Sequence, residues 1–154
     1  MPLQIGIIGY GYMGEIRHRT LIQHKNIDLS MICETNKKIL FDEQNITVVR
    51  NPLEVIESNV DAVFICTPNH LIPKLAIECL ERGKHVFCEK PPGRTLEDIV
   101  QMRNAENRNL GTKLMFGFNH RYHPGVLRAK SIVDSGRMGK IIALRGLYGK
   151  SGGK

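Results

Sequence analysis

Short apolar runs alternate with amphipathic segments along most of the 154-residue chain. The apolar runs have the length of strands, and several are apolar throughout, which is typical of strands that a parallel sheet buries on both faces. The predicted strands are residues 5–8, 29–33, 46–49, 61–66, 84–88 and 113–118. The predicted helices are residues 15–24, 37–43, 52–58, 71–81, 95–107 and 125–135. This alternation predicts an α/β fold with a doubly wound, mostly parallel sheet.

The first predicted strand runs directly into a glycine-rich turn, Gly9-Tyr-Gly-Tyr-Met-Gly14, which opens the first helix. Glycines at this spacing allow a tight turn and close approach of the backbone to a pyrophosphate, and the helix N-terminus presents free N–H groups. Glu34 follows the second strand about 20 residues after Gly14, where a carboxylate accepts hydrogen bonds from an adenosine ribose. These two features predict a Rossmann dinucleotide-binding unit.

The chain carries 22 lysines and arginines against 15 acidic residues, a formal net charge of +7. The basic residues are scattered, without the basic run or aromatic–basic pattern of a nucleic-acid-binding protein. We therefore expect no nucleic-acid partner. We interpret the charge as a positive field around a site for an anionic cofactor and a small-molecule substrate.

No apolar run reaches the roughly 18 residues of a membrane span, and the N-terminus enters a strand directly instead of showing the order of a signal peptide. The sequence therefore predicts a cytoplasmic protein without a membrane partner. The four cysteines lack C-x-x-C spacing, and the six histidines lack the paired spacing of zinc ligands. We expect free, buried thiols and no bound metal.

Three further motifs follow predicted strands in order: Cys66-Thr-Pro-Asn-His70, Cys88-Glu-Lys-Pro91 and Asn119-His-Arg-Tyr-His-Pro124. Together with the glycine-rich turn, they resemble the ordered signature of the Gfo/Idh/MocA family of glucose–fructose oxidoreductases and inositol dehydrogenases. The resemblance implies an NAD(P)-dependent oxidoreductase that transfers a hydride between nicotinamide and a CH–OH carbon of a sugar, polyol or sugar nucleotide. It also implies a Rossmann domain over residues 1–138, followed at 139–154 by the first strand of a substrate domain that is otherwise absent. The whole protein would be a homo-oligomer assembled through that substrate domain.

The resemblance also assigns site residues. The cofactor-binding positions would be Gly9, Tyr10, Gly11, Tyr12, Met13, Gly14, Glu34, Thr67, Pro68, Asn69, His70, Glu89, Lys90 and Asn119. Lys90 would be the catalytic residue and would orient a substrate hydroxyl, with Arg121 and His123 as further substrate contacts. In the family the proton acceptor is usually a histidine of the substrate domain, so this chain alone is expected to be inactive. The Lys90–Pro91 peptide bond is a candidate for the cis form.

A carboxylate at position 34 repels a 2′-phosphate, which favours NAD over NADP. Lys37 and Lys38 lie close behind it and are able to screen such a phosphate. The simpler interpretations are a plain strand-to-helix turn at residues 9–14 and a solvated acid at position 34.

The later motifs also have structural interpretations. Thr67 or Asn69 could cap the following helix, and Glu89 could form a structural ion pair with Lys90. At the level of function, the alternatives are an inactive NAD(P)-sensing regulatory protein of the same fold and an enzyme that uses a nucleotide methyl donor. The Glu89-Lys90-Pro91 motif has no place in methyl transfer.

Overall fold

The computed structural model describes residues 1–35, 45–147 and 149. The chain divides into two compact units, Met1–Phe118 and Asn119–Lys154. The first unit therefore ends before the domain boundary that the sequence predicts after residue 138. The assignment of residues 139–154 to the start of a substrate domain stays a prediction.

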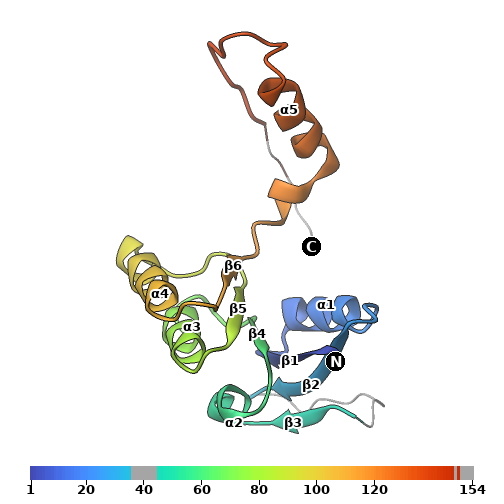
Figure 1. The fold of residues 1–154 in the computed structure, drawn as a ribbon, viewed down its shortest axis with the longest axis vertical. Helices are drawn as coiled ribbons and strands as arrows, with labels where there is room; N and C mark the ends of the chain where they lie inside the picture. The colour runs from blue at the N-terminus through green and yellow to red at the C-terminus, as the bar shows by residue number, and fades with distance from the viewer. Residues whose placement is uncertain (36–44, 148, 150–154) are drawn as a thin grey trace. The chain divides into compact units, whose positions relative to one another are not determined.

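The first unit is built from alternating strands and helices (Figure 1). They are β1 (Leu3–Ile8), α1 (Tyr12–Leu21), β2 (Ile27–Cys33), β3 (Thr47–Val49), α2 (Pro52–Glu57), β4 (Ala62–Ile65), α3 (Ile72–Glu81), β5 (His85–Cys88), α4 (Leu96–Arg108) and β6 (Leu114–Phe116). The 6-stranded sheet has the order β3-β2-β1-β4-β5-β6, and every neighbouring pair is parallel. The doubly wound parallel fold is therefore confirmed. The order of the strands reverses between β1 and β4, and ligands bind at such a switch point, outside the carboxyl ends of the strands.

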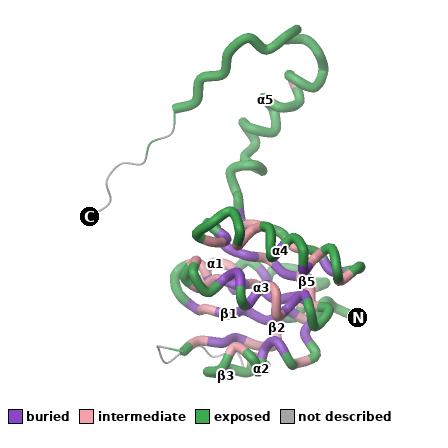
Figure 2. The backbone as a smooth tube through the Cα atoms, turned by 90° about the vertical axis from the view of Figure 1, so that its left-hand side faces the viewer, coloured by how far each residue is buried: buried purple, intermediate pink, exposed green. Residues whose placement is uncertain are grey.

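Two hydrophobic clusters cover the two faces of this sheet. Ile5 and Ile7 pack in one cluster with Leu21 of α1, whereas Ile8 packs in the other cluster with side chains of α2, α3 and α4. Successive side chains of a strand point to opposite faces, so α1 covers one face and α2 to α4 cover the other. In Figure 2 much of β1 and part of β5 have the colour of buried residues, whereas β3, at the edge of the sheet, is mostly exposed. The sheet therefore has a packed core on both faces, with its carboxyl edge left for a ligand.

The second unit contains a short 3₁₀ helix, η1 (Asn119–Tyr122), and α5 (Pro124–Asp134). The imidazole of His123 accepts a hydrogen bond from the Gly125 N–H at 3.2 Å and caps α5. Nearly all described residues of this unit are exposed, as the colouring in Figure 2 shows. Among the described residues, no helix has both the length and the apolar character that crossing a bilayer requires.

One sequence-based expectation differs from the structure, one element of the structure was not expected, and one expectation falls outside the described residues. Residues 140–147 form no strand, because a strand needs a neighbouring ladder and the described part of the chain offers these residues none. The sequence also gave no expectation of η1, since a single helical turn has no hydrophobic period. The predicted helix at residues 37–43, with Lys37 and Lys38, lies outside the described residues.

A capping box begins α4, as the order Thr95-Leu-Glu-Asp98 predicts. One oxygen of the Asp98 carboxylate accepts hydrogen bonds from the backbone N–H groups of Arg94, at 2.7 Å, and Thr95, at 3.0 Å. The Asp98 N–H donates in return to the Thr95 hydroxyl at 3.2 Å. The bonds from Arg94 and then Thr95 lower the pKa of Asp98 below its ordinary value of 3.8.

We predict that Asp98→Asn lowers the thermal unfolding midpoint at pH 7, because a neutral amide binds these N–H groups less strongly. The folded-state pKa of Asp98 is lowered, so the carboxylate stabilises the fold above pH 3.8 and loses this effect as pH falls through the folded-state pKa. Circular dichroism melts at several pH values should show the gap between variant and wild type closing below pH 3.8. Glu97→Gln, in the same helical turn, is the control. A gap that is equal at every pH would contradict the prediction.

Candidate functional site

The turn after β1 is shaped by two close approaches of backbone to backbone. Gly9 has φ +92°, and a Cβ there would lie 2.8 Å from the carbonyl carbon of Cys66. A Cβ on Gly14 would lie 2.2 Å from the carbonyl oxygen of Gly9. Neither position has room for a side chain, so α1 begins directly against the end of β1.

Gly11 differs from these two glycines. A Cβ at Gly11 would have no atom within 4 Å, so open space lies in front of the N-terminus of α1. The Glu15 N–H makes the first bond back along the helix, to the Gly11 carbonyl at 3.0 Å. The N–H groups of Tyr12, Met13 and Gly14 come before this bond and have no acceptor within the helix. Space and free donors thus coincide at the positive end of a helix dipole, which suits a pyrophosphate.

Glu34, at the end of β2, is bound to this turn. Its Oε2 accepts the Tyr10 N–H at 2.9 Å, while the Gly9 N–H donates to the Cys33 carbonyl at 2.9 Å. The ring of Tyr10 is buried, and its hydroxyl lies 2.5 Å from Nδ1 of His18 on α1. The Tyr10 amide is thus already engaged, and the carboxylate is held in a fixed orientation at the mouth of the turn.

A cavity of about 440 Å³ lies at the carboxyl ends of β1, β2 and β4. Its lining residues are Ile8, Gly9, Gly11, Cys33, Glu34, Thr35, Pro52, Cys66, Thr67, Pro68, His70 and Leu71. The structure therefore brings together the glycine-rich turn, the strand-end acid and most of the Thr67–His70 motif. Several predicted residues of the first unit do not line this cavity: Tyr10, Tyr12, Met13, Gly14, Asn69, Glu89 and Lys90. Six lining residues were not predicted as site residues, because their types do not by themselves indicate a ligand contact: Ile8, Cys33, Thr35, Pro52, Cys66 and Leu71.

Thr67 carries a polar group that the fold itself does not use. Its hydroxyl oxygen is buried and has no hydrogen-bond partner within the described residues. The N-cap of α3 is Leu71, and no side chain caps this helix. The alternative of a capping role for Thr67 or Asn69 is therefore wrong, because α3 begins later than such a cap requires.

Glu89 directly follows β5 in a buried position, and its partner is an arginine of α1. The Arg17 Nε donates to Glu89 Oε1 at 2.7 Å, and Arg17 Nη2 contacts the same oxygen. Lys90 is exposed, and its backbone N–H donates to Glu89 Oε2 at 3.3 Å. The alternative of a structural Glu89–Lys90 ion pair is wrong, because the guanidinium of Arg17 takes that place. The Lys90–Pro91 peptide bond is cis, as considered from the sequence.

Arg17 was missed by the sequence reasoning. It lies within the predicted first helix, and a single arginine there is ordinarily solvated. The available signal was indirect: a carboxylate at a buried strand end needs a partner, and a cation on the helix that covers the same face supplies one.

The four cysteines are free thiols, and Cys33, Cys79 and Cys88 are buried, as predicted. Burial is the main reason that the pKa of Cys66, beside the cavity, is raised to about 12, with Glu89 adding to the effect. Such a thiol stays protonated at neutral pH and is a poor nucleophile. Among the described residues, no three or more His, Cys, Asp or Glu side chains are grouped to hold a metal ion.

The remaining predicted residues belong to the second unit. Asn119 and Arg121 lie on η1, and His123 caps α5; all three are exposed. Their assignment to cofactor and substrate contacts stays a prediction.

The strand order, the turn against α1 and the acid after β2 together define a dinucleotide-binding Rossmann domain. The model of the oxidoreductase family with an NAD-binding Rossmann fold matches residues 3–118. The chain belongs to this family, Gfo/Idh/MocA, and NAD is the dinucleotide that the family fold binds. The matched range coincides closely with the first compact unit.

Two curated relatives and one solved structure illustrate the similarity. Myo-inositol 2-dehydrogenase of Thermotoga maritima is 33% identical over 93% of this chain and 44% of its own length. Levoglucosan dehydrogenase of Pseudarthrobacter phenanthrenivorans is 32% identical over 95% of the chain and 40% of its own length. The structure of scyllo-inositol dehydrogenase of Lactobacillus casei with NAD(H) and scyllo-inositol has a TM-score of 0.80 at 25% identity, over 90% of this chain and 43% of that one. The chain therefore spans less than half the length of these relatives.

We predict that Gly11→Ala weakens NADH binding at least about tenfold, because the new methyl group enters the space in front of the α1 N-terminus. The backbone of Gly11 is extended, with φ −76° and ψ −165°, so the loss of stability should stay near 1 kcal/mol. Fluorescence titration with NADH and thermal melts would separate the two effects. Gly146→Ala, also in open space, is the control. Unchanged NADH affinity in Gly11→Ala would contradict this placement of the pyrophosphate.

Proposed function

We propose that this chain is the cofactor-binding part of an NAD-dependent dehydrogenase that acts on a CH–OH carbon of a sugar, polyol or sugar nucleotide. One observation carries the proposal: the turn before α1, Glu34 and Thr67 all line the same cavity, and space is open at Gly11 in front of the N-terminus of α1. The dehydrogenase names of the relatives support the substrate class. They also favour an enzyme over the alternative of an inactive cofactor-sensing protein.

The cofactor would extend along the carboxyl edge of the sheet. Its adenosine ribose would bind Glu34, whose carboxylate disfavours the 2′-phosphate of NADP, and its pyrophosphate would face the amides of Tyr12 and Met13. Because β4 and β5 lie on the opposite side of β1 from β2, the nicotinamide half would extend toward residues 67–70 and 89–90. Asn119 would complete the cofactor contacts.

Bound NAD supplies the hydride acceptor. Lys90 would orient the substrate hydroxyl through its ammonium group, since it is exposed and directly follows the buried Glu89. Arg121 and His123 would add substrate contacts. The proton acceptor would be a histidine outside this chain.

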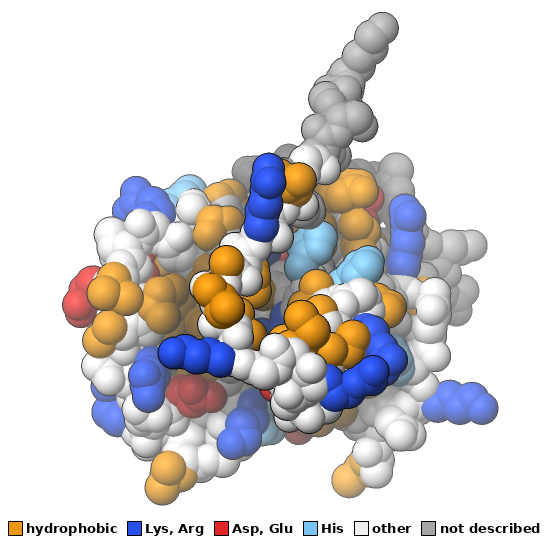
Figure 3. Space-filling model, turned by 90° about the horizontal axis from the view of Figure 1, so that it is seen from above, with side chains coloured by type: hydrophobic (Ala, Val, Ile, Leu, Met, Phe, Trp, Pro, Cys, Tyr) orange, Lys and Arg blue, Asp and Glu red, His pale blue; other side chains and the backbone are white. Residues whose placement is uncertain are grey.

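The partners follow from the same proposal. The substrate is a small molecule, and the whole protein would be a cytoplasmic homo-oligomer without a nucleic-acid or membrane partner. In support, Figure 3 shows Lys and Arg side chains among hydrophobic, acidic, histidine and uncharged ones. A dispersed charge does not provide the basic stripe that a nucleic-acid backbone requires.

We predict that the chain binds NADH more tightly than NADPH and that Glu34→Gln reduces this preference about tenfold. The amide removes the charge that repels a 2′-phosphate, while its oxygen is still able to accept the Tyr10 N–H. Isothermal titration of both cofactors would measure the ratio of dissociation constants. Failure of the wild-type chain to bind either cofactor would overturn the proposed function.

We predict that Lys90→Met, assayed in a longer protein that includes a substrate domain, lowers kcat/KM by at least about 100-fold and leaves NADH affinity within about threefold. The methionine keeps the length of the side chain but not the ammonium. Lys84→Met is the matched control, because Lys84 precedes β5 and its ammonium donates to the Ser58 carbonyl at 2.6 Å. If Lys90→Met turns over substrate as fast as Lys84→Met, Lys90 has no catalytic role and the assignment is wrong.

A further inference from the structure

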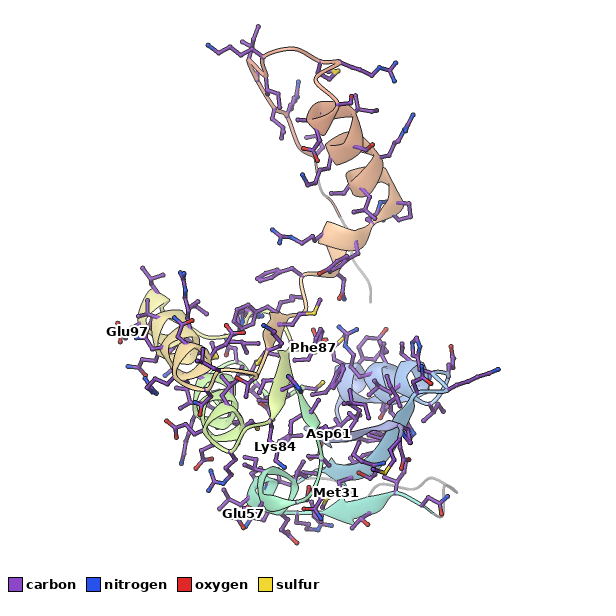
Figure 4. The ribbon with its side chains drawn as sticks, in the orientation of Figure 1. Met31, Glu57, Asp61, Lys84, Phe87 and Glu97 are labelled. Atoms are coloured by element: carbon purple, nitrogen blue, oxygen red, sulfur yellow. The ribbon has the colours of Figure 1, made fainter. Side chains whose placement is uncertain are left out.

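Arg17 of α1 makes two contacts at the end of β5, one with the carboxylate of Glu89 and one with the ring of Phe87. Its guanidinium donates to Glu89 Oε1 through Nε and Nη2. The same guanidinium lies over the ring of Phe87, with 4.8 Å from its carbon to the ring centroid; Phe87 is labelled in Figure 4. The ring of Phe87 in turn stacks on Phe64 of β4, with 4.8 Å between the centroids. The arginine is thus held in one geometry by an ion pair and a cation–π contact.

The ion pair is largely removed from solvent. The exposed fractions of the two side chains are 16% for Arg17 and 7% for Glu89. The other carboxylate oxygen, Glu89 Oε2, accepts a hydrogen bond from the Lys90 N–H. It also faces Gly117, since a Cβ added to Gly117 would lie only 3.0 Å from this oxygen. Solvent therefore screens the charge of Glu89 poorly, and the guanidinium is its close counter-charge.

This pair has a defined place along the proposed cofactor. Arg17 is on the helix whose N-terminus would bind the pyrophosphate, and Glu89 follows β5, which lies on the opposite side of β1 from the strand that precedes Glu34. The pair thus lies on the nicotinamide side of the site and away from the adenosine. The nicotinamide ring is cationic in NAD⁺ and neutral in NADH, so a net charge at this strand end would bind the two forms unequally.

We propose that Arg17 is a positioning residue of the cofactor site, which acts through Glu89: it holds the strand end that carries Lys90 and cancels the carboxylate charge beside the nicotinamide half. The proposal rests on the proposed function. It assigns Arg17 a role in setting the balance between NAD⁺ and NADH binding, in addition to packing α1 on the sheet.

The test uses titration of this chain with NAD⁺, NADH and ADP at low ionic strength, where salt screens the charges at this strand end least. In Arg17→Met, the affinity ratio should shift toward NAD⁺ on the order of tenfold, the effect of one added charge in a partly buried site. In Glu89→Gln, the remaining guanidinium should shift the ratio toward NADH. The double variant Arg17→Met/Glu89→Gln should return to the wild-type ratio.

ADP lacks the nicotinamide half, so its affinity should stay within about twofold in all three variants. A structural role alone would weaken all three ligands together. Arg108→Met, which removes the exposed Arg108–Glu81 pair on α4 and α3, is the matched control and should leave the ratio unchanged. If Arg17→Met does not fold, the test relies on Glu89→Gln, in which the affinity ratio should shift toward NADH.

An unchanged NAD⁺ to NADH ratio in the folded single variants, with wild-type binding intact, overturns the role of Arg17 and leaves the proposed function standing. If the NAD⁺ to NADH affinity ratio stays shifted in the double variant, Arg17 does not act through Glu89, and that part of the proposal is overturned. Absence of binding by the wild-type chain overturns both proposals.

Discussion

The close approach of α1 to the end of β1 is the constraint on which the rest of the site depends. Without side chains at Gly9 and Gly14, the helix begins directly against the strand, and its free N–H groups face the carboxyl edge of the sheet. The same placement orients the rest of α1. His18 meets the buried hydroxyl of Tyr10, and Arg17 reaches the end of β5. One backbone contact thus positions both the proposed pyrophosphate site and the side chains around it.

The fold could be predicted well from the sequence because its signals are local. Apolar runs such as Asp61–Cys66 are too short for helices and are bounded by turn residues, and the spacing from Gly14 to Glu34 fits one βαβ unit. Residues 140–147 show the limit of this reasoning. Their composition is that of a strand, but a strand forms only beside another one, which is a property of the neighbours and not of the segment.

The site was only partly predictable, since motifs identify strand ends but not the partners that reach them from elsewhere. The sequence placed Glu34 and Thr67 at the correct edge of the sheet, where both line the cavity. It did not give the partner of Glu89, because Arg17 lies 72 positions away and is brought near only by the packing of α1 on the sheet. Long-range ion pairs depend on the tertiary fold, and residue spacing does not encode them.

The bond between Glu34 and the Tyr10 amide has a consequence for the redesign of cofactor preference. In the proposed site, the residue that would discriminate between the two dinucleotides also accepts a hydrogen bond from the loop that would bind their common phosphates. Replacing it with a small or basic side chain would remove the discrimination and, at the same time, release the loop. The proposed function thus couples selectivity to loop order, and an engineered NADP-binding form would need a new acceptor for that amide as well as a new cation.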